Sequence, residues 1–231
     1  MRIDEVISQP LEEGPHDPHI FKAVFMAGGP GSGKSYVAGK MLGGTGLKTI
    51  NSDEIYEYLA QKHDLDLGNP DVVGSPQGQE IRNKAKELTK KRRGHYLDGR
   101  LGVVIDGTGK DVAKVAKDSE ALKSLGYDTM MIMVNTSLEQ AQRLNKQRAR
   151  TVPDDMLTKM WHQVQQNLMQ FQQVFGAANF HVVDNTFGQE NKDREENFRQ
   201  VYRNVQKFLN SPPSSRVAKA WLQDQQSGGE N

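Results

Sequence analysis

The stretch GGPGSGKS, residues 28–35, decides the fold of this 231-residue chain. It matches the pattern G-x-x-x-x-G-K-[ST], with an apolar strand-like run before it at residues 21–27 and a helix-like stretch after it. Glycines let backbone N–H groups turn inward around a phosphate, and the helix start adds favourable partial charge. In such loops the lysine reaches the β- and γ-phosphates and the last hydroxyl holds Mg²⁺. We therefore expect ATP and Mg²⁺ to bind at Gly29, Gly31, Ser32, Gly33, Lys34 and Ser35.

Apolar runs alternate with helical patterns along the rest of the chain. Strands are expected at residues 21–27, 48–52, 101–105, 128–134 and 180–183. Helices are expected between them, with a loop at residues 65–78. This alternation predicts an α/β, doubly wound P-loop NTPase fold with a parallel sheet of about five strands and helices on both faces.

The flanking segments differ in composition from the expected domain. Residues 1–20 are polar and proline-containing, which indicates an N-terminal arm, and residues 21–210 form the expected P-loop domain. Residues 211–231, with a double proline, paired serines and a Ser-Gly-Gly end, predict a flexible C-terminal tail.

Composition excludes several classes of site. The chain has no cysteine, so disulfides, thiolate zinc sites and a cysteine nucleophile are ruled out. Its net charge of +1 is too small to produce an overall positive potential that would by itself indicate nucleic-acid binding. No apolar run approaches the ~18 residues that span a bilayer, and the first residues lack a signal-peptide layout. A cytoplasmic protein without membrane contact is expected.

Two carboxylates follow expected strands, at the edge of a parallel sheet where ligands bind. We expect Asp53 to follow the strand beside the phosphate-loop strand, where it could accept a proton from an attacking hydroxyl, and its alternative role is a helix cap. Asp106 is placed to order Mg²⁺ together with Ser35, and its alternative is a turn aspartate before Gly107. Lys110 follows closely and is a candidate for contact with the acceptor.

Basic residues crowd two segments. Arg143, Arg148 and Arg150 precede a Val-Pro pair, and a mobile lid carrying them would stabilise the charge of the transferred group. The alternative is a solvated helix end. The basic stretch at residues 82–93 contains glutamates and is typical of a solvated helix face, with phosphate or nucleic-acid contact as its alternative.

Five segments together resemble the P-loop kinases that include polynucleotide 5′-hydroxyl kinases and zeta toxins. They are GGPGSGKS (28–35), INSDE (50–54), VVIDGTG (103–109), RLNKQRARTVPDDML (143–157) and HVVDN (181–185). The resemblance covers about residues 21–185. The more specific features are the Asn-x-Asp after the second strand and the arginine-rich segment that ends in Val-Pro.

The resemblance implies particular roles. Asp53 would act as general base, and Arg148, with Arg143 or Arg150, would bind the donor phosphates, while Asp184 and Asn185 would lie near the nucleobase. The group often has an arginine shortly after the base that contacts the acceptor, and residues 54–57 contain none.

Three functions are therefore compatible with the sequence. The first is an ATP-dependent phosphotransferase acting on a polynucleotide 5′-hydroxyl. The second is a zeta-toxin-like kinase of a nucleotide sugar or another small nucleotide. The third is a non-catalytic nucleotide-binding module that recruits a partner, because a phosphate loop also occurs in switches and motors.

Overall fold

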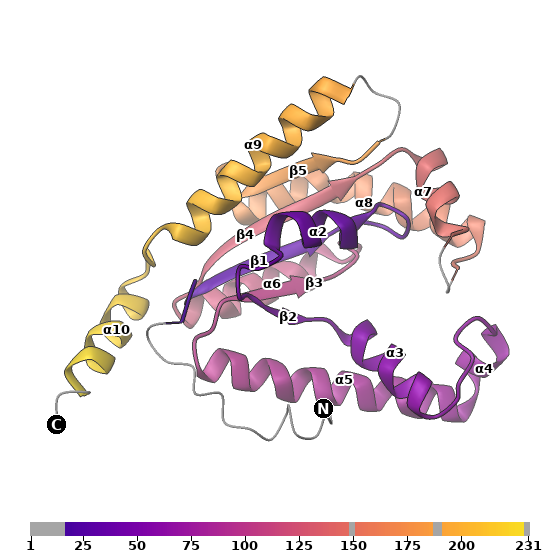
Figure 1. The fold of residues 1–231 in the computed structure, drawn as a ribbon, viewed down its shortest axis with the longest axis horizontal. Helices are drawn as coiled ribbons and strands as arrows, with labels where there is room; N and C mark the ends of the chain where they lie inside the picture. Colours follow the sequence, from indigo (N-terminus) through magenta and orange to yellow (C-terminus); the bar gives the residue numbers. More distant parts are fainter. Residues whose placement is uncertain (1–16, 148–150, 187–190, 229–231) are drawn as a thin grey trace.

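A computed structural model describes residues 17–147, 151–186 and 191–228. Its strands are β1 (Lys22–Ala27), β2 (Lys48–Ile50), β3 (Val103–Asp106), β4 (Asp128–Asn135) and β5 (Phe180–Asp184). Its helices are α2 (Lys34–Leu42), α3 (Ser52–Lys62), α4 (Pro70–Gly74), α5 (Pro76–Asp98), α6 (Val112–Ser124), α7 (Leu138–Asn145), α8 (Asp154–Phe175), α9 (Asn191–Asn210) and α10 (Arg216–Gly228). Strands and helices alternate as the sequence predicts (Figure 1).

The five described strands form one parallel sheet in the order β2-β3-β1-β4-β5. The strand before the phosphate loop is central, and β3 and β4 are its neighbours. In the register, Met26 of β1 lies opposite Asp106 of β3. The carboxyl ends of β1 and β3 therefore meet at one edge, where a ligand binds in folds of this type.

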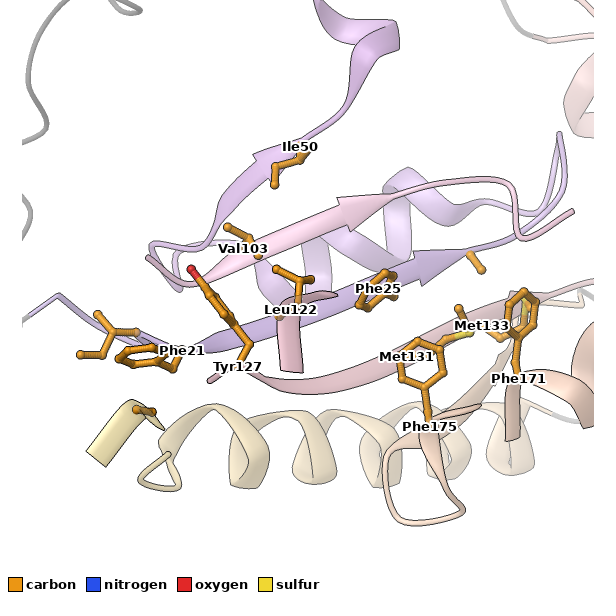
Figure 2. Close-up of a cluster of buried hydrophobic side chains, with 14 of the residues drawn as sticks. Phe21, Phe25, Ile50, Val103, Leu122, Tyr127, Met131, Met133, Phe171 and Phe175 are labelled. Carbon is orange, nitrogen blue, oxygen red and sulfur yellow. The ribbon is translucent and has the colours of Figure 1, made fainter. Parts of the chain in front are cut away.

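Side chains of the central strands alternate between two cores because successive residues point to opposite faces. On one face Phe25, Met131 and Met133 pack with Leu122 of α6 and Phe171 of α8, as Figure 2 shows. On the other face the alternate strand residues pack against α2 and α9 through Val37, Met41, Val201, Val205 and Leu209. The sheet is thus covered on both faces, as predicted for a doubly wound fold.

A separate small core lies beyond the β2 edge of the sheet, where α3, α4 and α5 sit together (Figure 1). Its buried residues come from α3 and α5: Ile55, Tyr56, Leu59, Ile81 and Ala85. The prediction of a loop over residues 65–78 is wrong for part of this region, because α4 lies inside it and α5 begins at Pro76. Asn69 and Ser75 cap these two helices, each directly before a proline at the first helical position, which proline favours.

The C-terminal segment contains a helix where the sequence predicted a flexible tail. In α10, Ala218 is fully buried and Trp221 meets the ring of Phe21 edge-to-face, with the ring centroids 5.4 Å apart. The sequence prediction missed this helix because residues 211–215 and 227–231, on either side of the amphipathic run, are rich in proline, serine and glycine. Among the described residues, no helix is long and apolar enough to cross a membrane.

Candidate active site

The phosphate loop connects β1 to α2 in a conformation that depends on its glycines. Gly31 and Gly33 have φ angles of 75° and 81°, in the left-handed region that favours glycine. Gly33 occupies the cap position of α2, and no side chain caps the first N–H groups of that helix. Those N–H groups and the helix dipole suit an anion. The Ser32 hydroxyl is buried and lacks a hydrogen-bond partner within the described chain, which suits a phosphate oxygen as its partner.

Two elements pack closely against the loop. A Cβ atom at Gly31 would collide with the carbonyl of Ala141 in α7, and one at Gly33 would collide with the side chain of Asn185. The Asn185 Nδ2 atom donates to the Ser32 carbonyl at 2.9 Å, and Arg194 donates to the Asn185 Oδ1 atom at 3.1 Å. The loop is therefore held from the end of β5 as well as from α7.

Three side chains from separate elements meet beside the loop. Lys34, the first residue of α2, forms an ion pair with Asp106 at the end of β3, and the two side chains are 18% and 20% exposed. Asn51 Nδ2 donates to the other carboxylate oxygen of Asp106 at 2.9 Å. Both oxygens of Asp106 are thus oriented, one toward the phosphate-loop lysine. The predicted role of Asp106 in ordering Mg²⁺ stays a prediction.

Asp53 stands at the start of α3, with its carboxylate exposed to solvent. Its N–H donates to the Asn51 Oδ1 atom at 2.8 Å, so Asn51 is the cap of this helix and Asp53 is not. Asp53 was also expected to follow a strand that lies beside the phosphate-loop strand, and that expectation is wrong. Its strand β2 is separated from β1 by β3.

The loop after β3 is held by a side chain of α8. Asn167 of α8 is buried, and its Nδ2 atom donates to the carbonyls of Gly109 and Lys110 at 2.9 and 3.1 Å. Gly109 has a φ of 74°, and a Cβ atom there would meet Ala27. The backbone beside Asp106 is therefore anchored by a side chain from a distant helix.

The predicted arginine lid is only partly within the described chain. Arg143 lies exposed in the last turn of α7, and Arg148 and Arg150 lie outside the described residues. Asn145 ends α7 and exchanges two hydrogen bonds with Val152, at 2.7 and 3.1 Å. These bonds join two described residues on either side of residues 148–150. The role of the arginines remains a prediction.

The two residues at the end of β5 have different contacts, and their predicted place near the nucleobase stays a prediction. Asp184 accepts a hydrogen bond from the Thr186 N–H at 2.9 Å, and Asn185 is the residue that contacts the phosphate loop. Sequence reasoning gave no structural role to Asn51, Asn167 or Asn185. The Asn-x-Asp spacing at residues 51–53 was the available signal for Asn51.

The residues present fit a magnesium ion bound together with nucleotide phosphates. Ser35 offers an exposed hydroxyl and Asp106 a carboxylate, which are the oxygen donors that Mg²⁺ prefers. In the described parts of the chain there is no cluster of three or more metal-ligating side chains. A site of this kind needs none, because phosphates and waters complete the coordination.

The arginines in the basic stretch of α5 contact other parts of the molecule. Arg92 donates to the Thr49 carbonyl of β2 at 3.2 Å, and Arg93 pairs with Asp118 at 3.2 Å. Arg82 lies over the ring of Tyr56 at 5.6 Å. The expectation of a solvated face is therefore wrong for these arginines.

The fold and site together define a P-loop kinase. The phosphate loop follows the central strand, and an acidic residue ends the adjacent strand beside the loop lysine. The sequence matches the zeta toxin family over residues 12–206, so the chain belongs to the zeta toxin family. Family and fold make it a phosphotransferase of the kinase type. The comparison with curated proteins found no match.

Solved structures support the same fold at low sequence identity. A structure from the PezAT chromosomal toxin–antitoxin system of Streptococcus pneumoniae aligns with a TM-score of 0.52 at 13% identity, covering 88% of this chain and 92% of that one. The AvrRxo1-ORF1:ORF2 complex with ATP contains a chain that aligns with a TM-score of 0.56 at 12% identity, covering 96% of this chain and 88% of that one. These likenesses concern the fold.

Proposed function

We propose that this chain transfers the γ-phosphate of ATP to a hydroxyl group of a small nucleotide-type acceptor, such as a nucleotide sugar. One observation carries the proposal. Lys34 and Asp106 are in contact, and Asn51 connects Asp106 to the start of the helix that presents Asp53. Zeta toxin membership and the ATP complex of a similar fold support ATP as the donor.

Each residue would have a distinct part in the transfer. The phosphate-loop N–H groups and Lys34 would neutralise charge on the transferring phosphoryl group, which is loosely bonded in the transition state. Asp53 would accept the proton of the acceptor hydroxyl as its oxygen bonds to the γ-phosphorus and the bond to the β-phosphate oxygen breaks. Ser35 and Asp106 would hold Mg²⁺, which would offset the negative charge of the phosphates.

The charge distribution favours a small acceptor over a polymer. Nucleic acid binding depends on several basic side chains that contact successive phosphates. In α5, Arg92 and Arg93 contact other parts of the protein, and the whole chain carries a net charge of only +1.

A polynucleotide 5′-hydroxyl is the second candidate acceptor. The sequence resemblance includes polynucleotide kinases, and α5 carries four exposed lysines: Lys84, Lys86, Lys90 and Lys91. If these lysines contact a nucleic acid backbone, activity on an oligonucleotide will fall steeply with salt concentration.

The test is a transfer assay with γ-labelled ATP. The acceptor panel contains nucleotide sugars, nucleosides and dinucleotides on one side and 5′-hydroxyl oligonucleotides on the other. Label on a nucleotide sugar or another small nucleotide supports the proposal, and label on oligonucleotides alone supports the second candidate. Tight ATP binding without transfer to any acceptor would favour the non-catalytic module instead.

A further inference from the structure

Asn51 joins the backbone of Asp53 to the carboxylate of Asp106 through a single side chain. Its Oδ1 atom accepts the Asp53 N–H at 2.8 Å, and its Nδ2 atom donates to Asp106 at 2.9 Å. The planar carboxamide holds its donor and acceptor atoms in a fixed relation. The start of α3 and the carboxylate at the end of β3 are therefore connected by one rigid group.

The strand register explains why these residues meet. Strands β2 and β3 pair in parallel with Ile50 opposite Ile105, and each isoleucine is followed by one of the two polar residues. Asn51 and Asp106 thus leave adjacent strands at the same level, although they are 55 positions apart in sequence. The other carboxylate oxygen of Asp106 accepts a hydrogen bond from the Lys34 ammonium group.

We propose that Asn51 is a positioning residue for phosphoryl transfer, which orients Asp106 toward the metal and phosphate site and fixes the start of α3, which carries Asp53. The proposal rests on the proposed kinase function and assigns a role within it. Asn51 acts through its two neighbours and needs no contact with either substrate. Without the Asn51 donor, Lys34 is the one side chain among residues 17–147, 151–186 and 191–228 that still bonds to the Asp106 carboxylate.

The chain contains a matched control. Asn69 caps α4 as Asn51 caps α3, and its Oδ1 atom accepts the Asp71 N–H at 3.0 Å. Its Nδ2 atom makes no hydrogen bond to the described residues. Aspartate caps a helix about as well as asparagine, so Asn→Asp preserves the cap at both positions. Only Asn51→Asp removes a donor from Asp106, and it adds a second carboxylate there.

The experiment compares the wild type with Asn51→Asp, Asn51→Ala and Asn69→Asp. Thermal unfolding checks the fold, and the transfer assay gives kcat and the KM for ATP. We expect Asn69→Asp to match the wild type in all three quantities. Asn51→Asp should lose about 10–100-fold in kcat, as partners of metal-site residues do, while the KM for ATP changes much less. Asn51→Ala should lose at least as much kcat and should also unfold at a lower temperature.

Two results would overturn the role of Asn51 as a positioning residue. If Asn51→Asp retains wild-type kcat while Asn51→Ala is slow, the side chain serves only as a helix cap. If Asn51→Asp and Asn69→Asp lose kcat equally, the loss comes from the cap and not from the contact with Asp106.

A binding measurement separates this proposal from the proposed function. If the wild type transfers phosphate to no acceptor, the function fails, and calorimetry of ATP binding then tests Asn51 alone. Affinities are measured with Mg²⁺ and with EDTA. The gain in ATP affinity that Mg²⁺ confers should be about 10-fold smaller in Asn51→Ala than in the wild type or Asn69→Asp. An equal gain in all three proteins would overturn the proposal.

Discussion

At the scale of single residues, Asp53 is the clearest test of chemistry against nucleotide binding. A hydroxyl is a weak nucleophile near neutral pH, and a positioned carboxylate typically contributes ~10²–10⁴-fold to its activation. Asp53→Asn retains the cap of α3, because that cap is formed by Asn51 and the backbone. We expect transfer to fall by about that factor while ATP affinity, measured by calorimetry, stays within a few-fold.

The adjacent Glu54 supplies the control for this substitution. It is also exposed and lies 3.9 Å from Arg92, so Glu54→Gln changes a neighbouring charge without altering the candidate base. Glu54→Gln should retain transfer. If Asp53→Asn also retains transfer, Asp53 is not the base, and Asp106 becomes the next carboxylate to test.

Arg148 carries a prediction that comes from the sequence alone, since it lies outside the described residues. An arginine directed at the charge of the transferring group contributes several kcal/mol to catalysis, so Arg148→Ala should lower kcat by about 10²-fold or more. The matched change is Lys159→Ala on the exposed side of α8, which should leave kcat unaltered. Equal kcat values for the two variants would remove Arg148 from the catalytic set.

At the scale of elements, Arg92 attaches α5 to the edge of the sheet. Its side chain is 21% exposed and donates to the Thr49 carbonyl, two residues before Asn51. A hydrogen bond to a charged group contributes roughly 1.5–3 kcal/mol, so Arg92→Ala should lower the free energy of unfolding by about that amount. Urea unfolding measures the loss, and Lys91→Ala on the exposed face should change it by less than about 0.5 kcal/mol.

The buried Lys22–Asp128 pair connects β1, β4 and the linker before α10. Lys22 is 1% exposed and donates to Asp128 at 2.7 Å, and the Ser214 N–H donates to the same carboxylate at 3.1 Å. Burial raises the pKa of Asp128, but hydrogen bonds from Lys22 and Ser214 and the Lys22 charge outweigh it, so the net pKa lies below its ordinary value of 3.8.

This lowered pKa predicts the direction of the pH dependence. Because the folded-state pKa of Asp128 lies below the unfolded value, the unfolded chain binds more protons as the pH falls. The contribution of Asp128 is complete above pH 3.8 and is lost as the pH drops through the folded-state pKa. The difference in unfolding free energy between the wild type and Asp128→Asn should therefore be largest near neutral pH and shrink below about pH 4. A difference that is independent of pH would contradict this assignment.

At the scale of the whole molecule, α10 closes the end of the main core. Trp221 packs against the buried Phe21, and Ala218 contacts the chain at Gly126, where a Cβ atom would lie 3.0 Å from the Ala218 nitrogen. Full truncation of a buried aromatic costs about 3–5 kcal/mol. Since Trp221 is only partly buried, Trp221→Ala should cost roughly half of that, or about 1.5–2.5 kcal/mol.

The measurement is the melting temperature together with the transfer rate. Val217→Ala is the control, because Val217 is 53% exposed in the same helix and its loss should be small. Trp221→Ala should melt at a lower temperature but retain kcat at a temperature where it is folded. An unchanged melting temperature would show that α10 does not stabilise the domain.

The local sequence was sufficient to predict the phosphate loop and the alternation of strands and helices. The loop is eight consecutive residues between an apolar strand and a helix, and its glycines and lysine act through their own backbone and charge. The long periodic segments also revealed most helices and strands, since hydrophobic periodicity is a local property. The sequence did not predict helices α4 and α10, because prolines, glycines and serines surround their helical runs.

Tertiary structure alone decided which side chains meet. In the sheet, β3, which ends in Asp106, lies beside the phosphate-loop strand β1. Strand β2, which precedes Asp53, does not. The parallel register brings Asn51 to Asp106, and the end of β5 brings Asn185 to Ser32 across 153 positions of sequence. Such contacts depend on sheet order and register, which are set by packing of the whole core and leave no signal in the spacing of residues along the chain.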